Sequence, residues 1–246
     1  MSKKTTFNEI RLDLTKHDRS KRRNNEIKFV IIHYTNLQST LESLKHLCNP
    51  FFKVSSHYLI SENGVIFNLV STDKSAWHAG KSKWSNYKNL NKTSIGIELQ
   101  NKGHKYGYEK FSKKQIKSLL NLCLRLKKKF KIKSNNFLGH SDIAPLRKFD
   151  PGVKFPWKKL SHYGLGKWYK KKLDLPKDIN SGKKNTRNFF FKNLHKIGYR
   201  YFSPNNPSFK DKYIIKAFKA HFNPSNKSIK IDKKSLKISH ILANSL

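Results

Sequence analysis

The chain has 246 residues, a length that allows one sizeable domain with or without a small second one. Apolar residues make up 36% of it, so a packed core can form despite a net charge of +38. The two cysteines, Cys48 and Cys123, have no CxxC spacing, which excludes a cysteine-based metal site, and no apolar run is long enough for a membrane span.

The positive charge is spread along the whole chain, together with abundant Asn, Ile and Phe. Nucleic acid is one partner for such a surface, because each Lys or Arg that meets a phosphate releases condensed counterions. Another anionic polymer or an acidic membrane surface would also suit it. The even spread favours a compositional bias over a recognition patch, so the charge by itself identifies no partner.

The start of the chain, residues 1–25, is basic and contains neither an apolar h-region nor a small-residue cleavage site. We expect it to form a weakly structured leader. Because no export signal is recognisable, the cytoplasm is the default location.

Three segments have the patterns of β-strands. Residues 27–35 (IKFVIIHYT) are almost continuously apolar, which is typical of a strand covered on both faces. Residues 57–70 contain two apolar strands around Asn63-Gly64, the strongest two-residue hairpin signal. In residues 93–101 the apolar side chains alternate, as they do in a half-buried strand.

Two segments have helical periodicity. Residues 41–48 are amphipathic, and in residues 112–130 the apolar positions recur every three or four residues, with Ser112 and Gln115 resembling a capping box. A short strand near residues 136–138 then leads into a turn-rich segment, residues 139–157. This order of elements predicts an α/β fold with a mixed central β-sheet flanked by helices.

The composition changes after Trp157. Residues 166–185 are polar and contain Pro and Gly, and three short helical patterns follow, around residues 186–197, 208–222 and 232–244. We therefore predict four parts: a leader (1–25), a main domain (26–165), a linker (166–185) and a three-helix C-terminal domain (186–246).

Eleven histidines and only 15 acidic residues leave few ways to build a catalytic site. His33 ends a buried strand, so its imidazole should emerge at the sheet's edge, where α/β proteins place their sites. His140 and Asp150 flank the turn-rich loop. Two imidazoles with one carboxylate are a common three-ligand set for catalytic zinc. Taken singly, each is a weak signal, because a His at a strand end is more often a structural or surface residue and an Asp before Pro-Gly is usually a turn residue.

Five strings occur in a fixed order along the chain: HYT (33–35), SSHYLISENG (55–64), AWHAG (76–80), SIGIEL (94–99) and GHSDIAPLRKFDPG (139–152). Together they resemble the AmpD- and AmiD-type N-acetylmuramoyl-L-alanine amidases, which share a fold with the peptidoglycan recognition proteins. The AmiD type is the more similar, because the chain continues into a segment that resembles a peptidoglycan-binding helical domain. A helical cap that only packs on the main domain is the alternative for this segment. The resemblance covers residues 26–158.

The resemblance implies a role for five residues. His33, His140 and Asp150 fall on the family's zinc ligands, Glu98 on the acid that activates water, and Lys148 on the cation that stabilises the tetrahedral intermediate. Without the resemblance, Glu98 would be read as a solvated residue on the outward face of a strand. Lys148 would be one lysine among many.

Several further residues are considered as substrate contacts or structural groups. AWHAG places Trp77 and His78 on a glycine-bearing loop that could line a sugar or peptide groove, and Arg147 is a further substrate-binding candidate. His57 is interpreted as a structural histidine. The histidines without a motif are expected at the surface: His104, His162, His195 and His221.

The implied enzyme is a monomeric, zinc-dependent amidase. It would cut the amide bond between the lactyl group of N-acetylmuramic acid, or of its 1,6-anhydro form, and L-alanine in peptidoglycan or muropeptides. A non-catalytic peptidoglycan-recognition module and, more remotely, a nucleic-acid-binding protein are the alternatives. An AmiD-like architecture would favour the cell envelope over the cytoplasm, so the location stays open.

Overall fold

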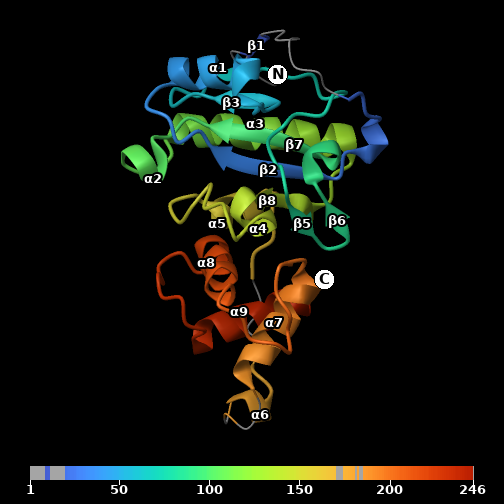
Figure 1. The fold of residues 1–246 in the computed structure, drawn as a ribbon, viewed down its shortest axis with the longest axis vertical. Helices are drawn as coiled ribbons and strands as arrows, with labels where there is room; N and C mark the ends of the chain where they lie inside the picture. The colour runs from blue at the N-terminus through green and yellow to red at the C-terminus, as the bar shows by residue number, and fades with distance from the viewer. Residues whose placement is uncertain (1–8, 12–19, 170–173, 181, 183–184, 246) are drawn as a thin grey trace, which may run out of the picture.

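The centre of the fold is a mixed β-sheet, which lies in the upper half of Figure 1. The computed structural model describes residues 9–11, 20–169, 174–180, 182 and 185–245. Within them, six strands follow the order β1-β4-β3-β7-β2-β8. Their bounds are β1 Glu9–Arg11, β2 Phe29–Tyr34, β3 Tyr58–Ile60, β4 Ile66–Asn68, β7 Ser94–Leu99 and β8 Phe137–Gly139.

The central strands run parallel, and β2 lies inside the sheet between β7 and β8, as its apolar sequence predicted. β2 pairs in parallel with β7 on one side and with β8 on the other, and β7 pairs in parallel with β3. β3 and β4 form the predicted antiparallel hairpin. A separate two-stranded ribbon consists of β5 (Lys83–Trp84) and β6 (Tyr87–Lys88). The predicted mixed sheet is therefore confirmed.

Helix α3 (Lys113–Phe130) covers one face of this sheet. Val30 and Ile32 of β2 share a buried apolar cluster with Leu119 and Cys123 of α3. The predicted cap is present, because the Ser112 side chain accepts a hydrogen bond from the Gln115 backbone N–H. The Gln115 amide nitrogen instead donates to the carbonyls of Ile60 and Gln100, which ties the helix to the ends of β3 and β7.

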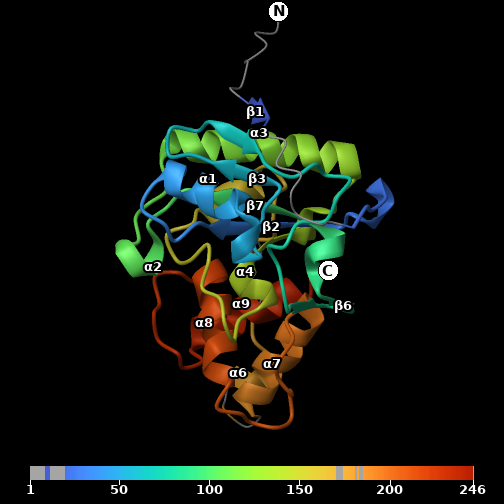
Figure 2. The ribbon, with the colours of Figure 1, turned by 45° about the horizontal axis from the view of Figure 1, so that its top comes forward.

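Of the other helices, those that follow β8 lie below the sheet and the first two lie beside it (Figures 1 and 2). Their bounds are α1 Thr40–Cys48, α2 Gly103–Tyr106, α4 His140–Ile143, α5 Trp157–His162, α6 Lys177–Asn180, α7 Thr186–Ile197, α8 Asp211–Phe222 and α9 Lys233–Ala243. The three predicted C-terminal helices correspond to α7, α8 and α9, and α7 packs against α9.

The C-terminal helices share an apolar cluster with the main part of the chain. Phe29, Leu138 and Ile143 belong to the same buried cluster as Leu194 of α7 and Phe218 of α8. In Figure 1, α4 and α5 lie between the sheet and this C-terminal group. The predicted division into four parts stays a prediction, but the two larger parts are in extensive contact.

Part of the predicted leader belongs to the folded body. Residues 1–8 and 12–19 lie outside the described residues, whereas β1 pairs with β4 at one edge of the sheet. Arg22 is 6% exposed, and its guanidinium donates hydrogen bonds to the carbonyls of Thr72, Asn91, Lys92 and Ser94. It therefore fastens the segment before β2 to two loops that border the site described below.

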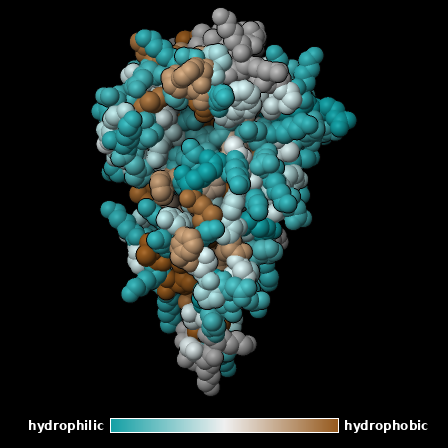
Figure 3. Space-filling view, viewed as in Figure 1, coloured by the Kyte–Doolittle hydropathy of each residue, from teal (hydrophilic) through white to brown (hydrophobic). Residues whose placement is uncertain are grey.

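The face shown in Figure 3 is mostly hydrophilic, in keeping with the high lysine content, with a smaller group of apolar side chains in its lower half. Apolar side chains that remain exposed include Leu41, Phe51 and Phe52 near α1, and Phe149 and Phe209. Among the described residues, no helix combines the length and apolar character needed to cross a bilayer.

Candidate metal centre and active site

His33 and Glu98 are neighbours on two parallel strands. The register of β2 and β7 places them directly opposite one another. Ile32 and Ile97, one position earlier, pack in the cluster under α3. Because side chains alternate along a strand, His33 and Glu98 point to the other face of the sheet. Both are buried, with 2% and 9% exposure.

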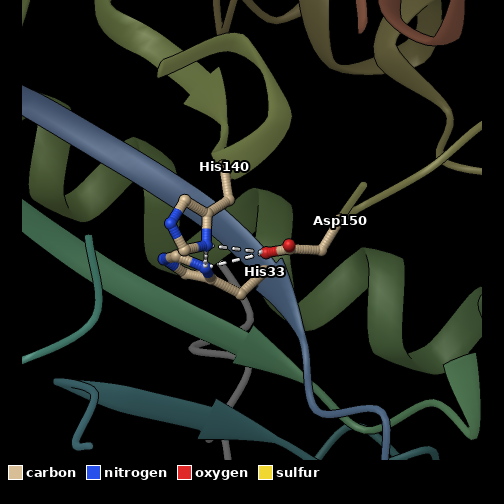
Figure 4. Close-up of side chains that lie close together, drawn as sticks. All are labelled: His33, His140 and Asp150. Carbon is tan, nitrogen blue, oxygen red and sulfur yellow. Dashed lines mark hydrogen bonds and ion pairs between the residues drawn. The ribbon is translucent and has the colours of Figure 1, made fainter. Parts of the chain in front are cut away.

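His140 and Asp150 come from the segment that follows β8. His140 is the first residue of α4, and the backbone N–H of Ser141 donates to the backbone carbonyl of Asp150 at 2.9 Å. His33 Nδ1 lies 3.0 Å from His140 Nδ1 and 2.9 Å from Asp150 Oδ2, and the latter two atoms are 3.2 Å apart (Figure 4). Two parts of the chain that lie far apart in sequence thus bring three possible ligand atoms together.

The partners of His33 assign its tautomer. The Ser94 hydroxyl donates to the carbonyl of Leu90 at 2.6 Å, so its single proton is used there. The 3.2 Å contact between Ser94 Oγ and His78 Nε2 therefore needs the proton on His78 Nε2. In a neutral His78 ring, Nδ1 is then an acceptor, and it receives the Nε2–H of His33 at 3.0 Å.

The Nε2 atom of His140 lies 3.2 Å from the carbonyl of Ala79 and 3.3 Å from Nη2 of Arg147, which donates to that same carbonyl at 2.6 Å. Because a carbonyl oxygen can only accept, the shorter contact of Nε2 assigns it the proton. In the neutral rings of His33 and His140, Nδ1 then carries no proton. Two imidazole lone pairs and one carboxylate oxygen converge without a proton among them. This donor set suits a divalent cation, and the three residues form a candidate metal site.

Burial and charge favour the same protonation states. Burial lowers the pKa of His33 to about 4, so the ring is neutral at neutral pH. Burial lowers the pKa of His78 well below its ordinary value. For Asp150, burial acts in the opposite direction, but the facing His140 and His33 outweigh it and hold the carboxyl pKa well below its usual range.

A glycine makes room for the histidine behind the ligand. The His78 ring lies directly against Gly96 of β7, where a Cβ atom would fall 2.4 Å from the imidazole Cγ. No side chain fits at that distance, which explains the glycine within SIGIEL. Any larger residue would push His78 away from His33.

The three candidate ligands open onto a cavity of about 320 Å³. Glu98 and Lys148 also line it, and Glu98 Oε2 is buried with no hydrogen-bond partner among the described residues. Burial, with the charge of Asp150, raises the pKa of Glu98 from 4.5 to about 8, against the opposing charge of Lys148. The cavity thus holds a carboxyl group that can gain or lose a proton near neutral pH.

The three expected substrate contacts differ in position. His78 and Arg147 line the cavity, but His78 is 6% exposed and bonded to His33 and Ser94. Arg147 donates to the carbonyls of Ala79 and Lys81. Trp77 is half-buried and is not among the lining residues. Their contact with a substrate stays a prediction.

The remaining histidines are partly as expected. His57 is fully buried, and its Nδ1 accepts the backbone N–H of Gly96, as a structural histidine would. The expectation of a surface position for His221 is wrong, because it is 3% exposed and its Nδ1 lies 2.8 Å from Asp142 Oδ2. Ser94 and Asp142 were overlooked, although both lie within the strings that carried the resemblance.

Comparison with known proteins gives concordant matches. Residues 23–153 match the Amidase_2 family, described as N-acetylmuramoyl-L-alanine amidase. The N-acetylmuramoyl-L-alanine amidase AmiD of Escherichia coli K12 is 41% identical over 157 residues, which cover 58% of this chain and 55% of AmiD. The 1,6-anhydro-N-acetylmuramyl-L-alanine amidase AmpD of Haemophilus influenzae is 33% identical over 155 residues, covering 54% of this chain and 80% of AmpD.

A solved structure resembles nearly the whole chain. It is the E. coli AmiD in complex with the substrate anhydro-N-acetylmuramic acid-L-Ala-D-γ-Glu-L-Lys, at 31% identity and a TM-score of 0.77. The match covers 95% of this chain and 94% of the other. The similarity therefore extends beyond the family segment into the C-terminal helices.

Proposed function

The chain belongs to the N-acetylmuramoyl-L-alanine amidase family, and from this membership we propose that it hydrolyses the lactyl–L-alanine amide of muropeptides. One observation carries the proposal. Two imidazoles and a carboxylate direct unprotonated ligand atoms to one point, and a carboxyl group with a raised pKa lines the same cavity.

We propose that His33, His140 and Asp150 hold a zinc ion. Their nitrogen and oxygen donors are those of a three-ligand catalytic zinc site. When bound, zinc supplies Lewis acidity, which lowers the pKa of water and polarises an amide carbonyl. His78 and the Ala79 carbonyl orient the two rings by accepting their Nε2 protons.

Glu98 is proposed to move the proton. Its Oε2 atom takes a proton from the attacking water and later delivers it to the leaving amine of L-alanine. A pKa raised to about 8 suits both transfers near neutral pH, because neither protonation state is strongly disfavoured. Lys148 lines the same cavity, and its ammonium is proposed to offset the negative charge that develops on the carbonyl oxygen.

The substrate is proposed from the relatives and from the cavity. AmiD of E. coli is known in complex with an anhydromuropeptide, and AmpD is named for the anhydro form. We extend this substrate class to the present chain, with Arg147 at the cavity as a candidate contact. Residues 186–246 are proposed to add affinity for the wall polymer.

Zinc content tests the assignment of the ligands. We expect the purified wild-type protein to contain close to one zinc ion per chain, and His140→Ala to have lost most of it. His162→Ala, at an exposed histidine outside the cavity, is the matched control and should retain the metal. Equal zinc in the wild type and His140→Ala would contradict the ligand set.

A product assay tests the reaction itself. Incubation of the zinc-loaded protein with a soluble anhydromuropeptide should release the free stem peptide, identified by its mass. The same incubation with intact sacculi tells which substrate is preferred. A zinc-loaded protein that binds the muropeptide without cleaving it would point to a recognition module instead.

A further inference from the structure

A second buried polar cluster lies on the far side of α4, outside the cavity. Its centre is the carboxylate of Asp142, which is 1% exposed. Oδ2 accepts the backbone N–H of Gly139 and faces Nδ1 of His221, both at 2.8 Å. Oδ1 accepts the hydroxyl of Tyr199 at 2.5 Å. The carboxylate therefore receives three donors, as a buried charge requires.

Two of these donors come from the C-terminal part of the chain. Tyr199 follows α7, and His221 belongs to α8. The His221 ring stacks on Trp157 of α5, with ring centres 4.0 Å apart and an angle of 12° between the planes. The Tyr199 ring packs edge-on against Trp84 of β5 at 4.9 Å. The two donors are thus held between both parts of the chain.

Helix α4 connects this cluster to the candidate metal site. It has a single turn, with His140 directed to the ligand cluster and Asp142 to the C-terminal helices. The backbone bond from Ser141 to Asp150 joins the two ligand-bearing segments. The start of this turn is closely packed, because a Cβ atom on Gly139 would lie only 2.7 Å from Cδ of Pro151.

We propose that Tyr199 and His221 are positioning residues for the metal site, acting through Asp142 on the turn that carries His140. The inference rests on the proposed function, since it assumes that His140 and Asp150 hold a metal. It assigns the C-terminal helices a part in building the site, in addition to any affinity for the wall.

Two conservative variants of the full-length chain test this role. Tyr199→Phe removes only the hydroxyl that donates to Oδ1, and His221→Phe keeps a ring that can stack on Trp157. Leu242→Ala is the matched control, because Leu242 is fully buried in the same apolar cluster but its side chain cannot donate a hydrogen bond to Asp142. The measurements are the zinc dissociation constant by chelator competition, the absorption spectrum with cobalt in place of zinc, and the Tm of the metal-free protein.

We expect Tyr199→Phe and His221→Phe each to weaken zinc binding about 10-fold, the lower end of the range for outer-shell residues, and to shift the cobalt bands. Leu242→Ala should lower the metal-free Tm while leaving zinc affinity and spectrum unchanged. A loss of Tm with unaltered zinc affinity in both aromatic variants would overturn the inference. If one of these two variants fails to fold, the zinc affinity of the other one tests the inference. A wild-type protein that binds no zinc would instead overturn the proposed function.

Discussion

Glu98→Gln separates the function of this buried carboxyl group from its effect on stability. Burial and the nearby Asp150 raise the pKa of Glu98 in the folded protein to about 8 from an ordinary 4.5. Between pH 4.5 and about pH 8, Glu98 therefore keeps its proton in the folded state and has lost it in the unfolded state. Stability from this group is fully present below pH 4.5 and is lost as the pH rises to about 8.

The size of the effect follows from the two pKa values. With 4.5 for the unfolded chain and about 8 for the folded one, the loss of stability is about 1 kcal/mol at pH 5 and about 3 kcal/mol at pH 7. Gln cannot ionise, so Glu98→Gln removes this pH dependence. Any packing or hydrogen-bond cost of the amide is the same at both pH values and cancels in the comparison. The free energy of unfolding of the variant, relative to that of the wild type, should therefore be higher at pH 7 than at pH 5 by about 2 kcal/mol.

Urea unfolding of the chelator-treated proteins at pH 5, 6, 7 and 8 measures this difference directly. The same variant, loaded with zinc, should show a kcat on a soluble muropeptide that is lower by about 10²–10⁴, the range for loss of a general acid–base group. A stability difference that stays constant from pH 5 to pH 7 would show that Glu98 titrates normally, and the burial argument would be refuted. Near-normal turnover would refute the proton-transfer role.

Two further predictions concern residues around the cavity. Lys148→Ala should lower kcat and kcat/KM together by about 10²–10³ in steady-state assays, and Lys148→Arg should not restore them, because a planar guanidinium cannot replace a compact ammonium. Lys110→Ala, at an exposed lysine, is the control and should be unaffected. His78→Ala should weaken zinc binding about 10–100-fold in chelator competition, because His33 loses the acceptor that orients it. His46→Ala, which changes another histidine of the same cavity, should leave zinc affinity unaltered.

The sequence predicted the elements with strong periodicity. β2 is continuously apolar because both its faces are covered, and α3 shows the three-and-four spacing of a helix packed on a sheet. His33 could be placed at the end of its strand for the same reason. That it meets Glu98 depends on the register between β2 and β7, which no pattern within either strand specifies.

The supporting residues could not be predicted, because their roles depend on contacts between distant segments. Arg22 donates to backbone carbonyls. Every residue has such a carbonyl, so the sequence does not mark which ones accept its hydrogen bonds. Ser94 is recognisable as a partner of His78 only once β7 has been placed beside the AWHAG loop. His221 lies 79 residues from Asp142, and its helix offers no motif that marks a buried pair.

The C-terminal helices were predicted as a separate binding module, and their contacts bear on how independent such a module can be. A freely tethered domain should meet the catalytic part through few, solvent-exposed contacts. Here the hydroxyl of Tyr199 and the ring of His221 supply two of the three donors to a buried carboxylate on the same helical turn as a candidate metal ligand. Removing either donor within the folded chain would leave that charge buried and under-bonded, a cost of about 1–3 kcal/mol or more. The helices and the site are therefore expected to be stable or unstable together, whether or not the helices also bind the wall.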